Sequence, residues 1–108
     1  MAQTITVQEP RALTQLATGR YLDTGTVAAY TFTLGFKPRY IHLINNTSRD
    51  EAFWIEGMAA ASANKRVAAG TGTLITSNGI TVSNTGFTFG LDTDLNVTNE
   101  QVSFVALA

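Results

Sequence analysis

The 108-residue sequence contains no cysteine and only two prolines. The lack of cysteine excludes disulfide bonds and thiolate metal sites. A zinc site would have to be built from the single histidine, His42, and from carboxylates, which is not a usual set of zinc ligands. We therefore expect no metal, and no sequence pattern indicates any other cofactor.

An excess of charge of either sign is also absent. The chain has 7 basic and 8 acidic residues, so its charge gives no reason to expect binding to nucleic acid or to an anionic membrane. Charged residues make up 14% of the chain, against roughly 25% in an ordinary soluble domain. A surface poor in charge is common in proteins that are covered by neighbouring subunits, although a small monomeric β-sandwich with threonine-rich faces has the same composition.

Long hydrophobic runs are missing as well. No segment reaches the roughly 18 consecutive apolar residues of a membrane-spanning helix. Met1–Pro10 contains no basic stretch followed by an apolar one, so no secretion signal is predicted. We expect no contact with a membrane.

Alternation of apolar and polar residues is the strongest pattern that is present. From Ala28 to Phe36 every second residue is apolar, which is the period of a half-buried strand. Pro38 ends this run because proline cannot donate to a strand ladder, and Tyr40–Ile44 then resumes as an apolar strand. The sequence therefore predicts a long central hairpin over residues 28–44.

Other short segments show the composition of strands bounded by turns. These are Thr4–Val7, Arg20–Asp23, Ala52–Ile55, Thr73–Thr76, Ile80–Val82, Gly86–Leu91 and Gln101–Ala108. Ser77-Asn78-Gly79 predicts a turn between two of them, because Asn-Gly readily adopts positive φ.

Two segments are less regular. Arg11–Ala17 is predicted to be a loop or one helical turn, and the alanine-rich Met58–Ala69 an excursion over the surface with a helical turn near Met58–Asn64. Taken together, the pattern predicts an all-β, single-domain antiparallel β-sandwich or jelly-roll-like barrel with one short helical turn. This domain would span residues 11–108 and follow an N-terminal arm of residues 1–10.

No catalytic residues are predicted. His42 lies in the middle of an apolar strand, where a histidine is more often a packed or interface side chain than a general base. No serine lies in a nucleophile-elbow motif, so we expect the protein not to be an enzyme. Asp92, Asp94 and Asn96 alternate as at the start of a calcium loop, but Val97 stands where that loop requires glycine. A solvated loop is predicted there instead.

Phe53 and Trp54 are consecutive on a predicted strand, so their side chains must point to opposite faces. One of them is exposed unless both faces of the strand are covered. An exposed aromatic residue suits a subunit contact or a sugar-binding platform. Trp54, with the polar residues Asn45, Asn46 and Asp50, is therefore a candidate subunit interface or glycan platform.

Three stretches of the sequence resemble small structural virion proteins of tailed bacteriophages. They are Gly-Phe-Lys-Pro-Arg-Tyr-Ile at 35–41, Glu-Gly-Met and the alanines that follow at 56–63, and Leu-Ile-Thr-Ser-Asn-Gly-Ile-Thr at 74–81 with Gly-Phe-Thr-Phe-Gly at 86–90. The resemblance implies a β-sandwich or jelly-roll-like subunit that is homo-oligomeric, often trimeric, and made in the host cytoplasm. Within this group a capsid decoration, or cement, protein is favoured, which binds the major capsid protein on the outer surface of the head.

The N-terminal quarter does not share the resemblance. There, Thr4, Ile5, Thr6 and Val7 alternate as in a strand and form a candidate capsid-contact arm, which would add a strand to an edge of a capsid subunit. The alternative function is a tail or fibre module that binds a host-surface glycan through the platform at Trp54.

Overall fold

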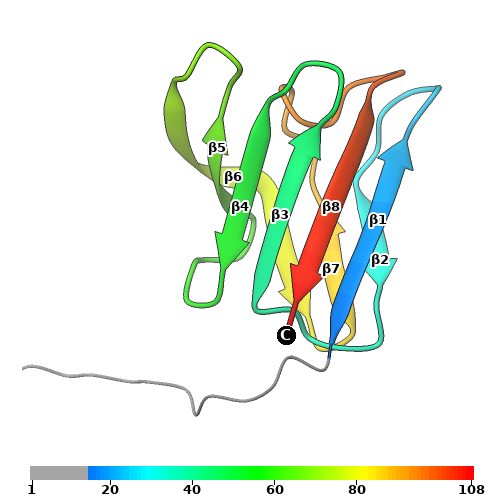
Figure 1. Ribbon diagram of the computed structural model, residues 1–108, viewed down its shortest axis with the longest axis vertical. Coiled ribbons are helices and arrows are strands. Elements are labelled where there is room, and N and C mark those ends of the chain that lie inside the picture. Colours follow the sequence, from blue (N-terminus) through cyan, green and yellow to red (C-terminus); the bar gives the residue numbers. More distant parts are fainter. Residues whose placement is uncertain (1–14) are drawn as a thin grey trace, which may run out of the picture.

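A computed structural model describes residues 15–108, which contain eight β-strands and no helix (Figure 1). The strands are β1 (Leu16–Leu22), β2 (Tyr30–Thr33), β3 (Tyr40–Asn45), β4 (Glu51–Ile55), β5 (Ser62–Arg66), β6 (Gly72–Ser83), β7 (Gly86–Phe89) and β8 (Gln101–Leu107). The predicted arm of residues 1–10, with the candidate strand Thr4–Val7, lies outside the described residues.

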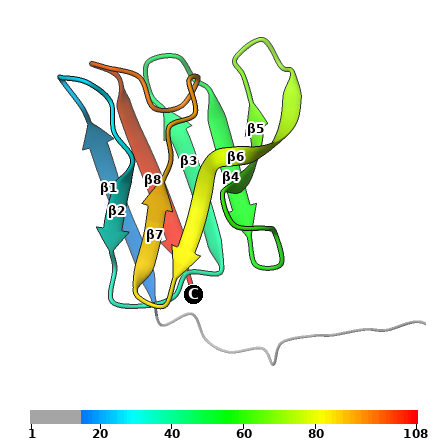
Figure 2. The same cartoon turned by 180° about the vertical axis from the view of Figure 1, so that it is seen from behind.

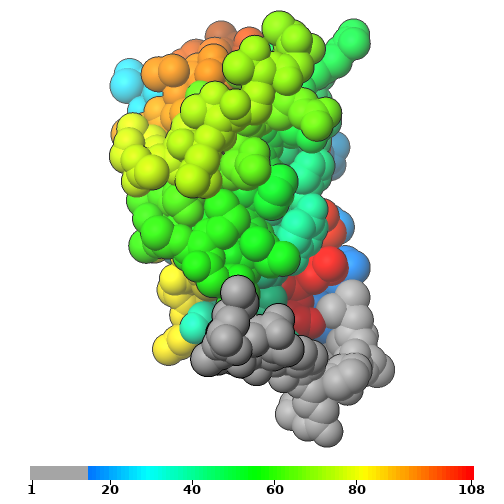
Figure 3. Space-filling model, turned by 90° about the vertical axis from the view of Figure 1, so that its left-hand side faces the viewer, coloured from blue at the N-terminus to red at the C-terminus, as the bar shows by residue number. Residues whose placement is uncertain are grey.

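All eight strands belong to one antiparallel sheet, in the order β1-β8-β3-β4-β5-β6-β7-β2. Strands β1, β8, β3 and β4 form the front layer in Figure 1, and β2, β7 and the second half of β6 lie behind it, as Figure 2 shows. The chain of β4, β5 and β6 covers the side where the sheet curls from one layer to the other (Figure 3). The prediction of an all-β antiparallel fold is confirmed, and its two layers are parts of one curled sheet.

The core lies between the two layers and is rich in phenylalanine. Phe87 and Phe89 of β7 are fully buried. Phe104 of β8 meets them from the front layer, with its ring centroid 5.1 Å from that of Phe87 and 4.7 Å from that of Phe32 on β2. The alternate positions of β3 and β8 supply part of the aliphatic core, namely Ile41, Leu43, Val102 and Ala106, and other elements add further residues such as Ile80 and Leu95. The predicted alternation in Gln101–Ala108 is therefore confirmed.

The predicted hairpin over residues 28–44 is wrong. Strand β2 pairs with β7 in the back layer, whereas β3 lies between β8 and β4 in the front layer. Between them the chain crosses from one layer to the other through Gly35, which has a φ of 84°, and the buried Pro38. Strand β3 buries Ile41 and Leu43, whereas on β2 only Phe32 is partly buried. The alternation predicts both strands but does not identify their partners.

The helical turn predicted near Met58–Asn64 is also wrong, because β5 begins at Ser62. Ser62 and Ala63 are both buried where the register of β5 and β6 shifts. Both residues have small side chains, and they lie where β6 changes its partner from β5 to β7. Of the predicted loop or helical turn over Arg11–Ala17, Leu16 and Ala17 belong to β1 instead, and Arg11–Thr14 lie outside the described residues.

Asn78 and Gly79 bend a strand and do not reverse the chain as predicted. Asn78 has the expected positive φ of 59°, yet β6 continues through it from Gly72 to Ser83. Gly79 lies so close to β5 that a Cβ atom would stand 2.6 Å from the carbonyl oxygen of Ser62. The bend lets the first half of β6 pair with β5 and the second half pair with β7.

We expect Gly86→Ala to destabilise the fold. Gly86 pairs with Thr33 at the end of β7, and a Cβ atom there would overlap the carbonyl oxygen of Phe32. Because backbone cannot move aside as a side chain can, we expect the free energy of unfolding, measured with urea, to fall by about 2 kcal/mol or more. Gly72→Ala is the matched control, since its Cβ would meet only an atom 4.0 Å away. Equal unfolding midpoints for the two variants would contradict this account of the layer contact.

Candidate interaction surface

The outward side of the front layer forms a continuous surface, which we call the outer face. It consists of the side chains that alternate with the core residues on β1, β8, β3 and β4. They are Leu16, Thr18, Arg20 and Leu22; Gln101, Ser103, Val105 and Leu107; Tyr40, His42 and Ile44; and Glu51, Phe53 and Ile55. The outer face is turned toward the viewer in Figure 1.

Strand register arranges the outer face in rows that run across all four strands. The first row is Leu16, Leu107, Tyr40 and Ile55. The second row is Thr18, Val105, His42 and Phe53, and the third is Arg20, Ser103, Ile44 and Glu51. The first row is thus entirely apolar or aromatic, and the third carries one charge of each sign on its two outermost strands.

Four apolar residues of the outer face are exposed to solvent, namely Leu16, Leu22, Phe53 and Ile55, and the other apolar residues of this face are half-buried. Leu16 is 58% exposed and Ile55 is 51% exposed, although they lie at opposite ends of the same row. Between them the rings of Tyr40 and Phe53 stack at a centroid distance of 6.5 Å. Contiguous exposed apolar surface of this kind marks sites of contact with other proteins, so the outer face is the candidate interaction surface.

Trp54 does not contribute to this surface, contrary to the prediction of an exposed platform. It points into the core, is 6% exposed, and its indole N–H donates to the carbonyl oxygen of Ala59 at 3.2 Å. Of the two consecutive aromatic residues, Phe53 is the one on the surface, as the alternation of a strand requires. The sequence does not show which of the two faces outward, because the alternation of a strand is satisfied whether Phe53 or Trp54 points into the core.

The three polar residues predicted to flank Trp54 lie together at the other end of β4, around the turn between β3 and β4. Asn45 is fully buried, and its side-chain oxygen accepts the N–H groups of Thr47 and Ser48 at 2.9 and 3.0 Å. Its amide nitrogen donates to the carbonyl oxygen of Leu95 at 3.1 Å and to Glu100 Oε1 at 2.9 Å. Asn45 therefore holds this turn and the loop between β7 and β8 together.

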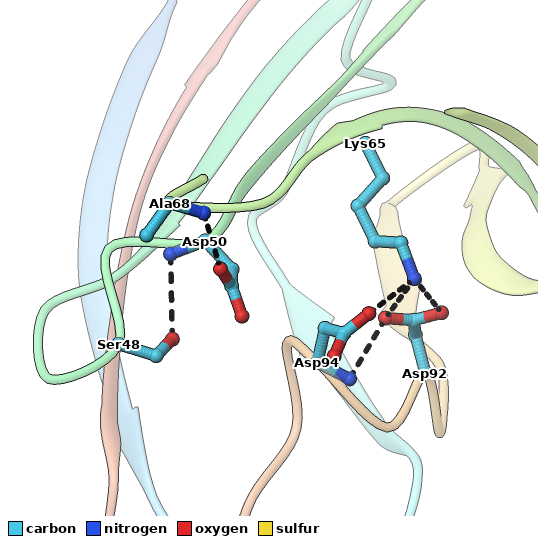
Figure 4. A network of polar contacts seen from close by, with 6 residues as sticks. All are labelled: Ser48, Asp50, Lys65, Ala68, Asp92 and Asp94. Carbon is cyan, nitrogen blue, oxygen red and sulfur yellow. Dashed lines mark hydrogen bonds and ion pairs between the residues drawn. The ribbon is translucent and has the colours of Figure 1, made fainter. Parts of the chain in front are cut away.

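Asn46 and Asp50 make local contacts around the same turn. Asn46 Nδ2 donates to Ser103 Oγ on β8 at 2.7 Å. Asp50 Oδ1 accepts the N–H of Ala68 at 2.8 Å, which ties the turn to the connection after β5 (Figure 4). These residues are brought together as predicted, but with Trp54 inside the core they do not form a platform around an exposed ring.

The loop that contains Asp92, Asp94 and Asn96 is part of the folded structure and not a solvated loop. Asp92 and Asn96 are buried, as is Leu95 between the two layers. Lys65 reaches into this loop from β5, and its ammonium nitrogen lies 3.1 Å from Asp92 Oδ1 and 2.7 Å from Asp94 Oδ2 (Figure 4). The alternating carboxylates thus bind an internal ammonium group where a calcium loop would bind a metal ion. Among residues 15–108 no group of three or more metal-binding side chains is present.

The lysine pKa reflects this environment. Burial is the largest single effect and lowers the pKa of Lys65, but its hydrogen bonds and charge interactions with Asp94 and Asp92 outweigh burial and raise the pKa above 10.5. The ammonium form is therefore the state that holds β5 to the loop between β7 and β8. No local pattern in the sequence indicates this cluster, because Asp92 and Asp94 lie 27 and 29 positions from Lys65.

His42 lies in the second row of the outer face. Its Nε2 is 4.0 Å from Glu51 Oε1, and both side chains are partly exposed. His42 thus lies on the outer face, and its predicted role as a packed or interface side chain stays a prediction. Within residues 15–108 no helix is long and apolar enough to cross a membrane.

A scan against protein-family models, a search of curated proteins and a search of solved structures each found no match to this chain. The functional interpretation therefore depends on the outer face and on the sequence resemblance.

We expect Lys65→Met to destabilise the protein by about 2 kcal/mol, because it leaves two neighbouring carboxylates without their counter-ion. The raised pKa of Lys65 sets the pH dependence of this loss. The stabilisation by the Lys65 ammonium group is complete below pH 10.5, the pKa of an ordinary lysine. It is lost as the pH rises through the raised pKa of Lys65 in the folded state. The difference in free energy of unfolding between the native chain and Lys65→Met, measured with urea, should therefore be constant near neutral pH. It should become smaller only above pH 10.5. Lys37→Met, a change of an exposed lysine, should leave stability unchanged; a loss as large as that of Lys65→Met would contradict the assignment.

Proposed function

We propose that this chain is a structural protein of a tailed-bacteriophage virion. In this proposal it is a capsid decoration protein that binds the major capsid protein on the outer surface of the head and assembles with itself. The observation that carries the proposal is the outer face, where apolar side chains in register remain exposed on an otherwise well-packed sheet. The resemblance of residues 35–41, 56–63 and 74–90 to small virion proteins supplies the biological context.

A decoration protein acts by binding, and the fold is suited to that role. It offers an exposed surface on one layer of a curled antiparallel sheet, and the resemblance implies a jelly-roll-like subunit. A protein that binds the expanded shell and not its precursor stabilises the expanded state by mass action, and no catalytic group is needed.

We favour this role over the alternative of a tail or fibre module that binds a host-surface glycan. That alternative needed Trp54 as an exposed stacking platform, and the indole ring is inside the core. Asn45, which would have bound the sugar beside it, is buried and fully occupied by its contacts with the adjacent turn and with the loop after β7.

We expect the purified chain to bind phage heads that lack it. Expanded heads, mixed with excess protein and pelleted, should carry bound chain, and electron microscopy should locate it at three-fold or quasi-three-fold positions on the outer surface. The heads should then withstand a higher temperature before they release DNA, because binding stabilises the shell. Unexpanded precursor shells are the control and should bind less. Absence of the chain from expanded heads would refute the proposed function.

The N-terminal arm gives a second test. If Thr4–Val7 add a strand to the capsid, deletion of residues 1–8 should abolish pelleting with heads. The deleted segment lies outside the described sheet, so the circular dichroism spectrum and the oligomeric state should not change. Undiminished binding by the deleted chain would show that attachment uses another part of the protein.

A further inference from the structure

We propose that the outer face is covered by the outer face of a second copy of the chain, related by a two-fold axis that runs parallel to the strands. This inference rests on the proposed function only in treating the outer face as an interaction surface. It goes further by naming the occupant and the arrangement.

The register of the front layer determines which residues such an axis brings together. Rotation about an axis parallel to the strands, between β8 and β3, places β1 opposite β4 of the second copy and β8 opposite β3. Each row stays at its own level along the strands. In the first row Leu16 then faces Ile55 of the second copy, and Leu107 faces Tyr40. The most exposed apolar residues of the first row therefore cover one another.

The charged residues of the outer face become complementary in the same arrangement. Arg20 on β1 and Glu51 on β4 share the third row. Within one chain they are three strands apart, about 14 Å at the usual strand spacing, which is too far for a direct ion pair. The two-fold axis brings Arg20 of each copy opposite Glu51 of the other, so two ion pairs form at the sides of the apolar contact.

A symmetric face-to-face arrangement with the axis across the strands, at the level of the second row, is unfavourable. An axis across the strands would place the first row on the third, so that Arg20 would lie against Leu16 of the second copy and Glu51 against Ile55. Neither charge would then gain a partner from the second copy: Arg20 would be covered by apolar side chains, and Glu51 would keep only neighbours within its own chain, such as His42 at 4.0 Å. Covering a charge in this way is costly. The distribution of charge on the outer face thus selects the axis parallel to the strands.

The contact is small for a permanent dimer. Four strands spaced by about 4.8 Å give a face of small area. This area is below the roughly 800 Å² or more that most obligate interfaces bury on each partner. We therefore expect a reversible dimer. This arrangement is two-fold, and it differs from the three-fold assembly that the resemblance implies.

Sedimentation velocity of the full chain, from about 5 to about 500 µM, tests the proposal. We expect a concentration-dependent shift from the 11.5 kDa chain to twice that mass. Ile55→Glu should keep the chain monomeric over this range. Leu74→Glu is the matched control, because Leu74 is at least as exposed but lies on β6, outside the outer face; it should dimerise like the unchanged chain.

A charge exchange tests the axis itself. Arg20→Glu and Glu51→Arg should each weaken dimerisation by about tenfold or more, because each creates two like-charge contacts. The double variant R20E/E51R should restore it, since the pairs re-form across the axis with their signs reversed. Glu51 is in register with Arg66 of β5, so thermal unfolding of each variant checks that the fold is kept.

Three results would overturn the proposal: a monomer at every concentration, whether the face is bare or covered by residues 1–14 of its own chain; a trimer; or a double variant that dimerises no better than the single ones. None of these depends on phage heads. A dimer that fails to bind heads would refute the proposed function but not the two-fold contact. A trimer that binds heads would refute the two-fold contact but not the proposed function.

Discussion

The curl of the single sheet is the constraint on which the rest of the structure depends. A flat sheet of eight strands would leave the phenylalanines of β7 and β8 on an open surface. The curl brings these strands face to face, although they lie far apart in the strand order. It is made possible at one corner, where Gly79 has no side chain and Ser62 and Ala63 have small ones. A few small residues thus convert one sheet into two packed layers.

Aromatic contacts close the opposite side of the curled sheet without strand pairing. The edge strands β1 and β2 are not paired with each other, but Tyr21 of β1 lies 5.5 Å from Tyr30 and 6.2 Å from Phe32 of β2, measured between ring centroids. Gly19 makes room for the ring of Phe104, which lies 4.7 Å from that of Phe32, since a Cβ atom at Gly19 would stand 2.5 Å from the Phe104 ring. Because ring contacts do not require a ladder of hydrogen bonds, the two edges can stay separate strands and still enclose the core.

Local patterns in the sequence were sufficient to predict strands but not their partners. Ala52–Ile55 and Gln101–Ala108 were located correctly because alternation over a few residues is a local property. The pairing of β2 with β7 and of β3 with β8 joins residues more than fifty positions apart, and a short connection through Pro38 looked the same as a hairpin turn. For the same reason the sequence could not show that Lys65 would neutralise Asp92 and Asp94, or which of Phe53 and Trp54 would face outward.

The positions of the charged residues in the fold help to explain why the chain has so few of them. Lys65, Asp92 and Asp94 are engaged with one another at the end of the sheet, where they join β5 to the loop after β7. Apart from His42, the outer face carries one basic residue, Arg20, and one acidic residue, Glu51, and these two lie on its two outermost strands. A solvent-exposed sheet face ordinarily carries polar residues at alternate positions, and the first row carries none of them apart from the hydroxyl of Tyr40. The alternation that builds the core cannot account for apolar residues on the opposite side of the same strands. A contact with another protein surface can account for them, because it removes the first row from water and leaves the charged third row with partners.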